Sequence, residues 1–226
     1  MESPKLDVFI FTPSYSGDVH AGYAASLLQS VALLTGRGYV TTPYFALNNA
    51  VVSFVRTVGL KAFLDSGAKW FVSIDADLAW RAEDLLALVE SPHDFTAGIY
   101  PYKTKDRSPM FQGKGIKEGN TGRYLEADAV PGGFTCVSRK AVEKMVAAYP
   151  DQMKHYKGKE VPFLYEHIFV KDENPLGEDY SFCKRWRDIG GKIFVLPGCE
   201  FTHYGSAEWQ GCMLTDDPRI RMGAEK

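Results

Sequence analysis

Two aspartates, Asp75 and Asp77, directly follow an apolar run, residues 70–74, that has the composition of a buried strand. Residues two apart in a strand project to the same face, so we expect both carboxylates to point the same way at the strand's carboxyl end. Carboxylates placed together repel each other and lose hydration, and a divalent cation removes that cost and can also hold a diphosphate. The spacing therefore indicates a metal site. The alternative is that both aspartates cap the next helix or face water.

A second acidic pair, Glu178-Asp179, opens a helix predicted to run to Ile189. Asp179 lies on the same side of that helix as the apolar Phe182 and Cys183, so it is expected to face inward, whereas Glu178 is expected at the rim. An inward carboxylate at this position either faces a cleft or interacts with the positive end of the helix dipole.

A histidine, His203, lies in a short extended segment, residues 199–204. A single histidine in an apolar neighbourhood is either a structural residue or a ligand. An imidazole beside two carboxylates would suit Mn²⁺ better than Mg²⁺, because nitrogen donors favour the softer ion.

Two further segments have the residue types of a ligand site. Residues 12–15, Thr-Pro-Ser-Tyr, offer a fixed turn and, in Tyr15, a ring on which a nucleobase can stack. Pro131-Gly132-Gly133 offers backbone without side chains, which allows a ligand to approach closely. Ordinary turn chemistry is the alternative for both.

The elements that must position these residues alternate regularly in the first half of the chain. Strands are expected at residues 6–11, 39–45, 70–74 and 95–100, and helices at about 19–35, 49–66 and 81–90. This alternation predicts a parallel sheet with helices on both faces. The second half has more loops (103–123 and 149–176), with helices at 138–148 and 178–189 and strands at 130–137, 192–196 and 199–204.

Composition restricts the class of protein. The chain has 226 residues, 45% of them hydrophobic, and a formal net charge of −2, which excludes a disordered chain and a strongly basic nucleic-acid coat. Four cysteines without a C-x-x-C pair favour a reducing compartment. With neither a signal peptide nor a long apolar run, we expect a cytoplasmic protein with no membrane segment.

In this order, the segments resemble the glycosyltransferases of the GT-A fold, from Val8 to about Gly205. The resemblance rests on FTPSY at 11–15, Arg56 placed 19 residues before Asp75, the D-x-D at 75–77, PGG-x-x-C-x-x-R at 131–139, GEDYSFCKR at 177–185 and THYG at 202–205. It implies an α/β fold of GT-A type: a Rossmann-like, mostly parallel sheet with helices on both faces and a loop-rich acceptor half.

The resemblance also implies a single domain over 1–226, with a nucleotide-binding half at 1–102, an acceptor and catalytic half at 103–205 and a C-terminal tail at 206–226. Its implied activity is metal-dependent transfer of a sugar from a nucleoside-diphosphate sugar, UDP-sugar favoured, to a hydroxyl. The family's small soluble members occur in bacteria and their viruses. Oligomeric state, the sugar and the donor base are left open.

Residue roles follow from the same resemblance. The implied donor-binding residues are Thr12, Pro13, Tyr15, Arg56, Asp75, Gly132 and Gly133; the metal ligands are Asp75, Asp77 and His203; and the catalytic residues are Asp179 and Glu178. In inverting members the aspartate of the acidic pair is the general base, here Asp179. In a retaining enzyme Asp179 or Glu178 would flank the donor instead. Many relatives have Arg-Asn where this chain has Arg56-Thr57, so the role of Arg56 is less firmly implied.

The acceptor is open between a carbohydrate and DNA. Residues 103–192 contain 17 Lys and Arg against 13 Asp and Glu, and some viral relatives transfer sugars to hydroxymethylated bases of DNA. A phosphate backbone could meet the basic residues of the two loops: Lys103, Lys105, Arg107, Lys114, Lys117, Arg123, Lys154, Lys157 and Lys159. The rival classes are a non-catalytic nucleotide-sugar-binding protein, a phosphohydrolase that uses the D-x-D, and a structural assembly protein.

Overall fold

A computed structural model describes residues 6–104, 108–110, 117–118 (backbone only), 124–170, 174–205 and 207–212. Its centre is an eight-stranded sheet of order β2-β1-β3-β8-β5-β11-β7-β6, in which all strands except β7 and β8 run in one direction. The strands are β1 (Val8–Ser14), β2 (Thr41–Leu47), β3 (Trp70–Ile74), β5 (Phe95–Ala97), β6 (Lys117–Glu118), β7 (Leu125–Ala127), β8 (Phe134–Ser138) and β11 (Ile193–Val195).

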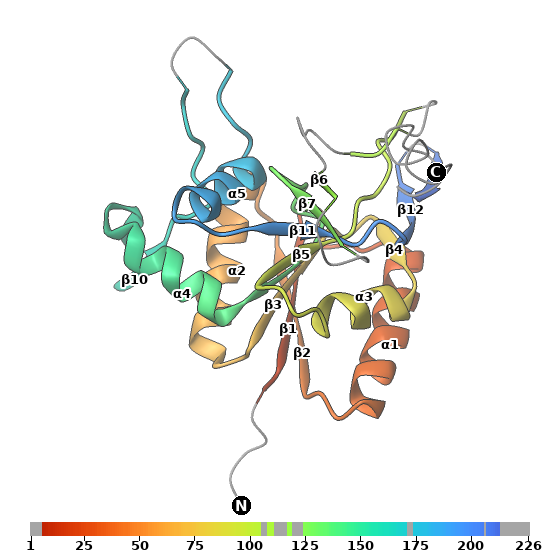
Figure 1. Cartoon of the computed structure of the whole chain (residues 1–226). Helices are drawn as coiled ribbons and strands as arrows, with labels where there is room; N and C mark the ends of the chain where they lie inside the picture. Colours follow the sequence, from red (N-terminus) through yellow and green to blue (C-terminus); the bar gives the residue numbers. More distant parts are fainter. Residues whose placement is uncertain are drawn as a thin grey trace, which may run out of the picture.

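Helices cover both faces of this sheet (Figure 1). One face holds α1 (Ala21–Gly36) and α3 (Ala82–Val89), and the other holds α2 (Val52–Ser66), α4 (Arg139–Ala148) and α5 (Glu178–Asp188). Alternate residues of β1 enter different cores, Val8 and Ile10 on the α1 side and Phe9 and Phe11 on the α2 side, because successive side chains of a strand point to opposite faces. The predicted fold class, α/β with a mostly parallel sheet and helices on both faces, is confirmed.

The first strand is longer than expected. The sequence predicted an end at Phe11, yet β1 continues to Ser14 and includes Pro13, which pairs with Ala46 of β2. On its other side β1 pairs with β3 only as far as Phe11. Beyond that residue the strand has a single neighbour, so the N–H that proline lacks costs no ladder bond there.

The position of β8 decides where the glycines lie. The sequence predicted a strand over residues 130–137, but β8 begins at Phe134 and runs antiparallel between β3 and β5. Ile74 at the end of β3 pairs with Phe134 at the start of β8. Gly132 and Gly133 therefore lie at the sheet edge where β3 ends.

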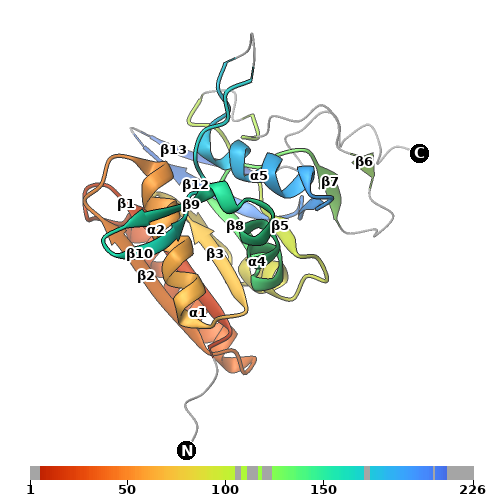
Figure 2. The ribbon, with the colours of Figure 1, turned by 90° about the vertical axis from the view of Figure 1, so that its left-hand side faces the viewer.

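Two small sheets complete the described structure (Figure 2). One joins β4 (Leu78–Trp80), β12 (Glu200–Tyr204) and β13 (Glu208–Cys212), of which β4 and β13 were not predicted. The other is a hairpin of β9 (Met153–Tyr156) and β10 (Lys159–Pro162) that follows the 3-10 turn η1 (Pro150–Gln152). The expectation of irregular structure over 149–176 is thus wrong for its first half. In the described part of the chain, no helix has the length and apolarity needed to cross a membrane.

Candidate active site

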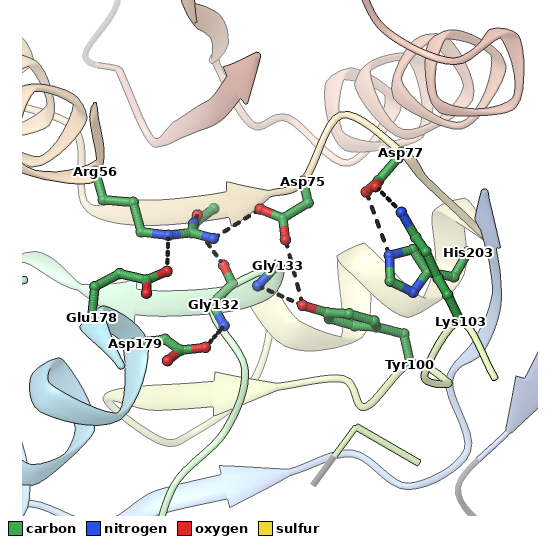
Figure 3. Close-up of polar contacts among 11 residues, drawn as sticks. Arg56, Asp75, Asp77, Tyr100, Lys103, Gly132, Gly133, Glu178, Asp179 and His203 are labelled. Atoms are coloured by element: carbon green, nitrogen blue, oxygen red, sulfur yellow. Dashed lines mark hydrogen bonds and ion pairs between the residues drawn. The ribbon is translucent and has the colours of Figure 1, made fainter. Parts of the chain in front are cut away.

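A buried arginine joins three segments at the carboxyl edge of the sheet (Figure 3). The Arg56 side chain comes from α2 and is 4% exposed. Its guanidinium donates to Ser73 Oγ at 2.8 Å and to the Gly132 carbonyl at 3.1 Å. It also pairs with Asp75 Oδ1 at 2.9 Å and Glu178 Oε1 at 3.4 Å. Burial alone would lower the pKa of Arg56, but the two carboxylates outweigh burial and raise it, so the group stays charged.

Asp75 lies between Arg56 and a tyrosine. The Tyr100 hydroxyl is 3.5 Å from Asp75 Oδ2 and accepts a hydrogen bond from the Gly133 N–H at 3.2 Å. A Cβ on Gly133 would lie 2.4 Å from Asp75 Oδ2 and 2.3 Å from the tyrosine oxygen. Glycine is needed here because two polar side chains approach the backbone directly.

Asp77 has a different set of partners. His203 Nε2 is 3.6 Å from Asp77 Oδ1, and Lys103 Nζ is 2.5 Å from Oδ2. The pairing of β12 with β4 places the histidine here, since it sets His203 opposite Leu78 and lets the Tyr204 N–H donate to the Asp77 carbonyl at 2.8 Å. Burial acts to raise the pKa of Asp77, but hydrogen bonds to His203 and Lys103 outweigh it and lower the pKa to about 2.

The donor atoms at Asp77 fit a divalent cation. His203 is 5% exposed, and its Nδ1 lies 2.9 Å from the Pro101 carbonyl oxygen, which can only accept. That contact makes Nδ1 a donor, so Nε2 either donates a second proton to the Asp77 carboxylate or offers its lone pair to a cation there. Two acceptor atoms in this position need a positive charge between them, either a proton or a metal ion.

The two aspartates do not form one cluster. The expectation that Asp75 and Asp77 point the same way is wrong, because β3 ends at Ile74 and both residues lie in the turn that follows it. Figure 3 shows Asp75 directed toward Arg56 and Asp77 directed toward His203. Within the described ranges, no three His, Cys, Asp or Glu side chains converge on one point. The geometry therefore favours Asp77 and His203 as ligands and gives Asp75 a bond to arginine.

The second acidic pair lies opposite Asp75. Asp179 faces inward as predicted: its Oδ2 accepts from the Gly132 N–H at 3.2 Å and its Oδ1 from the Tyr180 N–H at 2.8 Å. Burial first, and the Glu178 charge second, raise the pKa of Asp179. Glu178 does not point along the rim as expected, because its side chain is 16% exposed and reaches Arg56.

A cleft of about 650 Å³ lies at this edge of the sheet. Its walls include Arg56, both aspartates of the turn, Glu178 and residues 13–16 and 18–20. Tyr15 lines this cleft and is 70% exposed. Thr12 does not line the cleft: it is 1% exposed and its hydroxyl bonds to that of Tyr23, so the structure gives no support to its predicted donor contact.

A second, more apolar hollow of about 870 Å³ adjoins the first and shares Asn49 with it. It lies between the start of α2 and the segment that leads to α5. Its lining is Asn49, Val51, Ser53, Phe54, Phe163, Glu166, His167, Phe169 and Pro175. The Ser181 hydroxyl ties this segment to α5, since it accepts from the Ile168 N–H at 3.0 Å and donates to the Leu176 carbonyl at 3.3 Å.

Sequence reasoning missed the contributions of Ser73, Tyr100 and Lys103 to the site. Ser73 was assigned only to a strand, and Lys103 was grouped with the basic residues expected to meet DNA. The available signal was position, because Tyr100 and Lys103 follow a strand that ends at the same edge as β3. Of the other basic residues of that loop, Lys105, Arg107, Lys114 and Arg123 lie outside the described residues, as does the side chain of Lys117.

Comparison with known proteins gives relatives by structure alone. No protein-family model and no curated protein sequence matches the chain. The chain is similar to A197 from STIV, with a TM-score of 0.53 and 17% identity over 89% of this chain and 87% of A197. This likeness concerns the fold.

Two enzymes are among the other solved structures that match. One is a Drosophila β-1,4-galactosyltransferase 7 mutant in complex with manganese, UDP-Gal and xylobiose, with a TM-score of 0.46 and 15% identity over 83% of this chain and 64% of that one. The other is the inositol-1-phosphate CTP transferase from T. maritima, with a TM-score of 0.43 and 10% identity over 88% and 89%. These two neighbours are a glycosyltransferase and a nucleotidyltransferase.

Proposed function

We propose that this chain is a metal-dependent glycosyltransferase that moves a sugar from a nucleoside-diphosphate sugar, UDP-sugar favoured, to a hydroxyl acceptor. One observation carries the proposal. A single cleft is lined by the exposed Tyr15 ring, by the Asp77 carboxylate, which faces the His203 imidazole, and by Glu178, whose neighbour Asp179 bonds to the Gly132 backbone. These groups are of the kinds that can bind the nucleobase, the diphosphate and the sugar of a donor.

Each part has a distinct task toward the donor. Tyr15 stacks on the base, and Pro13 holds the adjoining backbone. Asp77 and His203 hold a divalent cation, with Mn²⁺ preferred over Mg²⁺ because one ligand is a nitrogen. When bound, the cation supplies positive charge to the leaving diphosphate.

Arg56 acts through its neighbours. It fixes Asp75, the Gly132 backbone and Glu178, so the groups that line the sugar position keep their geometry.

The acceptor proton goes to Asp179. The acceptor oxygen attacks the anomeric carbon, the bond from that carbon to the diphosphate oxygen breaks, and the acceptor's proton moves to the carboxylate. Burial supports this role because it raises the pKa of Asp179, which makes the carboxylate a stronger base than an exposed aspartate. This assignment corresponds to inversion; in a retaining enzyme Asp179 would flank the donor instead.

The second hollow is the acceptor site in this proposal. Its aromatic walls suit the flat face of a ring, and its Asn, Ser, Glu and His side chains suit hydroxyl groups. The neighbouring β9–β10 hairpin exposes Lys154, Lys157 and Lys159, which could contact the phosphates of DNA. The candidate acceptors are therefore a carbohydrate and a hydroxymethylated base in DNA. A salt titration of binding to duplex DNA distinguishes the two acceptors. Affinity that falls as the salt concentration rises supports DNA as the acceptor, whereas no binding to the duplex even at low salt supports a carbohydrate acceptor.

The test is release of UDP from UDP-sugars with Mn²⁺ present. Asp179→Asn should lower kcat by about 10²–10⁴-fold and leave the donor KM nearly unchanged, because it removes the base and keeps the cleft. Asp188→Asn, on the same helix and 46% exposed, is the matched control. Donor binding without turnover would indicate a non-catalytic binder, and release of pyrophosphate would indicate a nucleotidyltransferase; either result rejects the proposal.

A further inference from the structure

Among the described side chains that pair with the Asp77 carboxylate, His203 has a task in the proposed function and Lys103 has none. It lies just after β5, in a loop whose stem is held by backbone bonds. The Tyr102 N–H donates to the Ser108 carbonyl at 2.9 Å, and the Met110 N–H donates to the Tyr100 carbonyl at 2.8 Å. The Pro101 carbonyl in the same stem contacts His203 at 2.9 Å. The segment that carries Lys103 is therefore also bonded to His203, and both side chains contact Asp77.

The lysine side chain fits its path to the carboxylate. Its stem passes Gly205, where an added Cβ would lie 3.0 Å from the Lys103 Cδ. The absence of a side chain at Gly205 leaves room for the stem. The ammonium then lies 2.5 Å from Asp77 Oδ2, on the carboxylate oxygen that His203 does not face (Figure 3).

The ion pair between Lys103 and Asp77 can break and re-form at little cost in free energy. The side chains of Lys103 and Asp77 are 37% and 42% exposed, and ion pairs with that much contact with water contribute little to stability. A divalent cation between Asp77 and His203 would stand close to the ammonium and repel it. The ammonium and the divalent cation therefore compete for the Asp77 carboxylate.

We propose that Lys103 is an internal cation that occupies Asp77 in the donor-free protein, competes with the divalent cation, and turns to the donor's diphosphate when metal and donor bind. The inference rests on the proposed function. It has a specific consequence: metal and nucleotide bind cooperatively, because the metal releases the ammonium and the diphosphate then pairs with it.

The test measures Mn²⁺ binding directly, by electron paramagnetic resonance of free Mn²⁺ in protein without nucleotide. Lys103→Met should bind Mn²⁺ about fivefold more tightly, because the competing charge is gone. In saturating Mn²⁺ the same variant should bind UDP about fivefold more weakly. Lys184→Met is the matched control, since Lys184 pairs with Asp188 at 2.9 Å with exposures of 42% and 46% away from the cleft.

A second variant keeps every charge. Gly205→Ala should displace the lysine stem and tighten Mn²⁺ binding about twofold, in the same direction as Lys103→Met. The inference is overturned if Lys103→Met binds Mn²⁺ no more tightly than the wild type, or if neither protein binds Mn²⁺. Turnover of UDP-sugar by the wild type is measured in parallel, so turnover with an unmoved Mn²⁺ affinity rejects this inference alone and leaves the proposed function standing.

Discussion

Replacing Arg56 by methionine tests whether one buried cation holds the site together. Its guanidinium bonds to Ser73 of β3, to the Gly132 backbone and to the Asp75 carboxylate. Removal of one partner from a buried ion pair costs about 3–5 kcal/mol, because the other charge stays buried without compensation. The Asp75 side chain is 27% exposed, so water recovers part of that cost, and we expect a loss of about 3 kcal/mol.

The assay is urea unfolding followed by circular dichroism, with a melting curve beside it. For a chain of this size a loss of about 3 kcal/mol corresponds to a fall in Tm of about 6–12 °C. Arg187→Met is the control, since Arg187 pairs with Asp128 at 2.8 Å with both side chains nearly half exposed, and should cost about 0–1 kcal/mol. If Arg56→Met costs no more than this control, the arginine does not hold the three segments, and the site's geometry has another origin.

Two further predictions concern the glycine and the acidic pair. Gly133→Ala should destabilise the protein by about 1–3 kcal/mol and weaken donor binding, because the new Cβ would lie 2.4 Å from an oxygen of Asp75. Thermal unfolding measures the loss of stability, and a donor titration measures the loss of affinity. An unchanged Tm would refute the close approach of Asp75 to the Gly133 backbone. Glu178→Gln should move the acid limb of the pH profile of kcat/KM to lower pH. Burial and then the Glu178 charge raise the pKa of Asp179, so activity falls as pH drops through that raised value, and removal of the charge lowers it. A limb that stays in place would mean that another group titrates.

The elements could be predicted from the sequence because their apolar patterns are strong. Strand β3 lies at residues 70–74 as expected, and helix α5 begins at Glu178 with Asp179 on its inward side. The location of the site followed from the same pattern, since the ends of parallel strands meet at one edge of the sheet.

The contacts within the site could not be predicted, because they depend on which strands pair. Insertion of β8 between β3 and β5 brings Gly133 to Asp75, and no local pattern indicates that order. The pairing of β12 with β4 likewise brings His203 to Asp77 across more than a hundred residues of sequence. The two aspartates were expected to share a direction because strand alternation was extended past the end of β3, and that alternation does not hold in the turn that contains them.

The proposed function depends on a divalent cation that Asp77 and His203 hold and that binds the donor's diphosphate. Calorimetric titration of UDP, with Mn²⁺ and with a chelator, into the wild type and Asp77→Asn tests it most directly; Asp128→Asn, 43% exposed and outside the cleft, is the control. We expect Mn²⁺-dependent binding that Asp77→Asn weakens at least about tenfold and Asp128→Asn leaves unchanged. Equal binding of UDP in the chelator, or by Asp77→Asn in Mn²⁺, would contradict it.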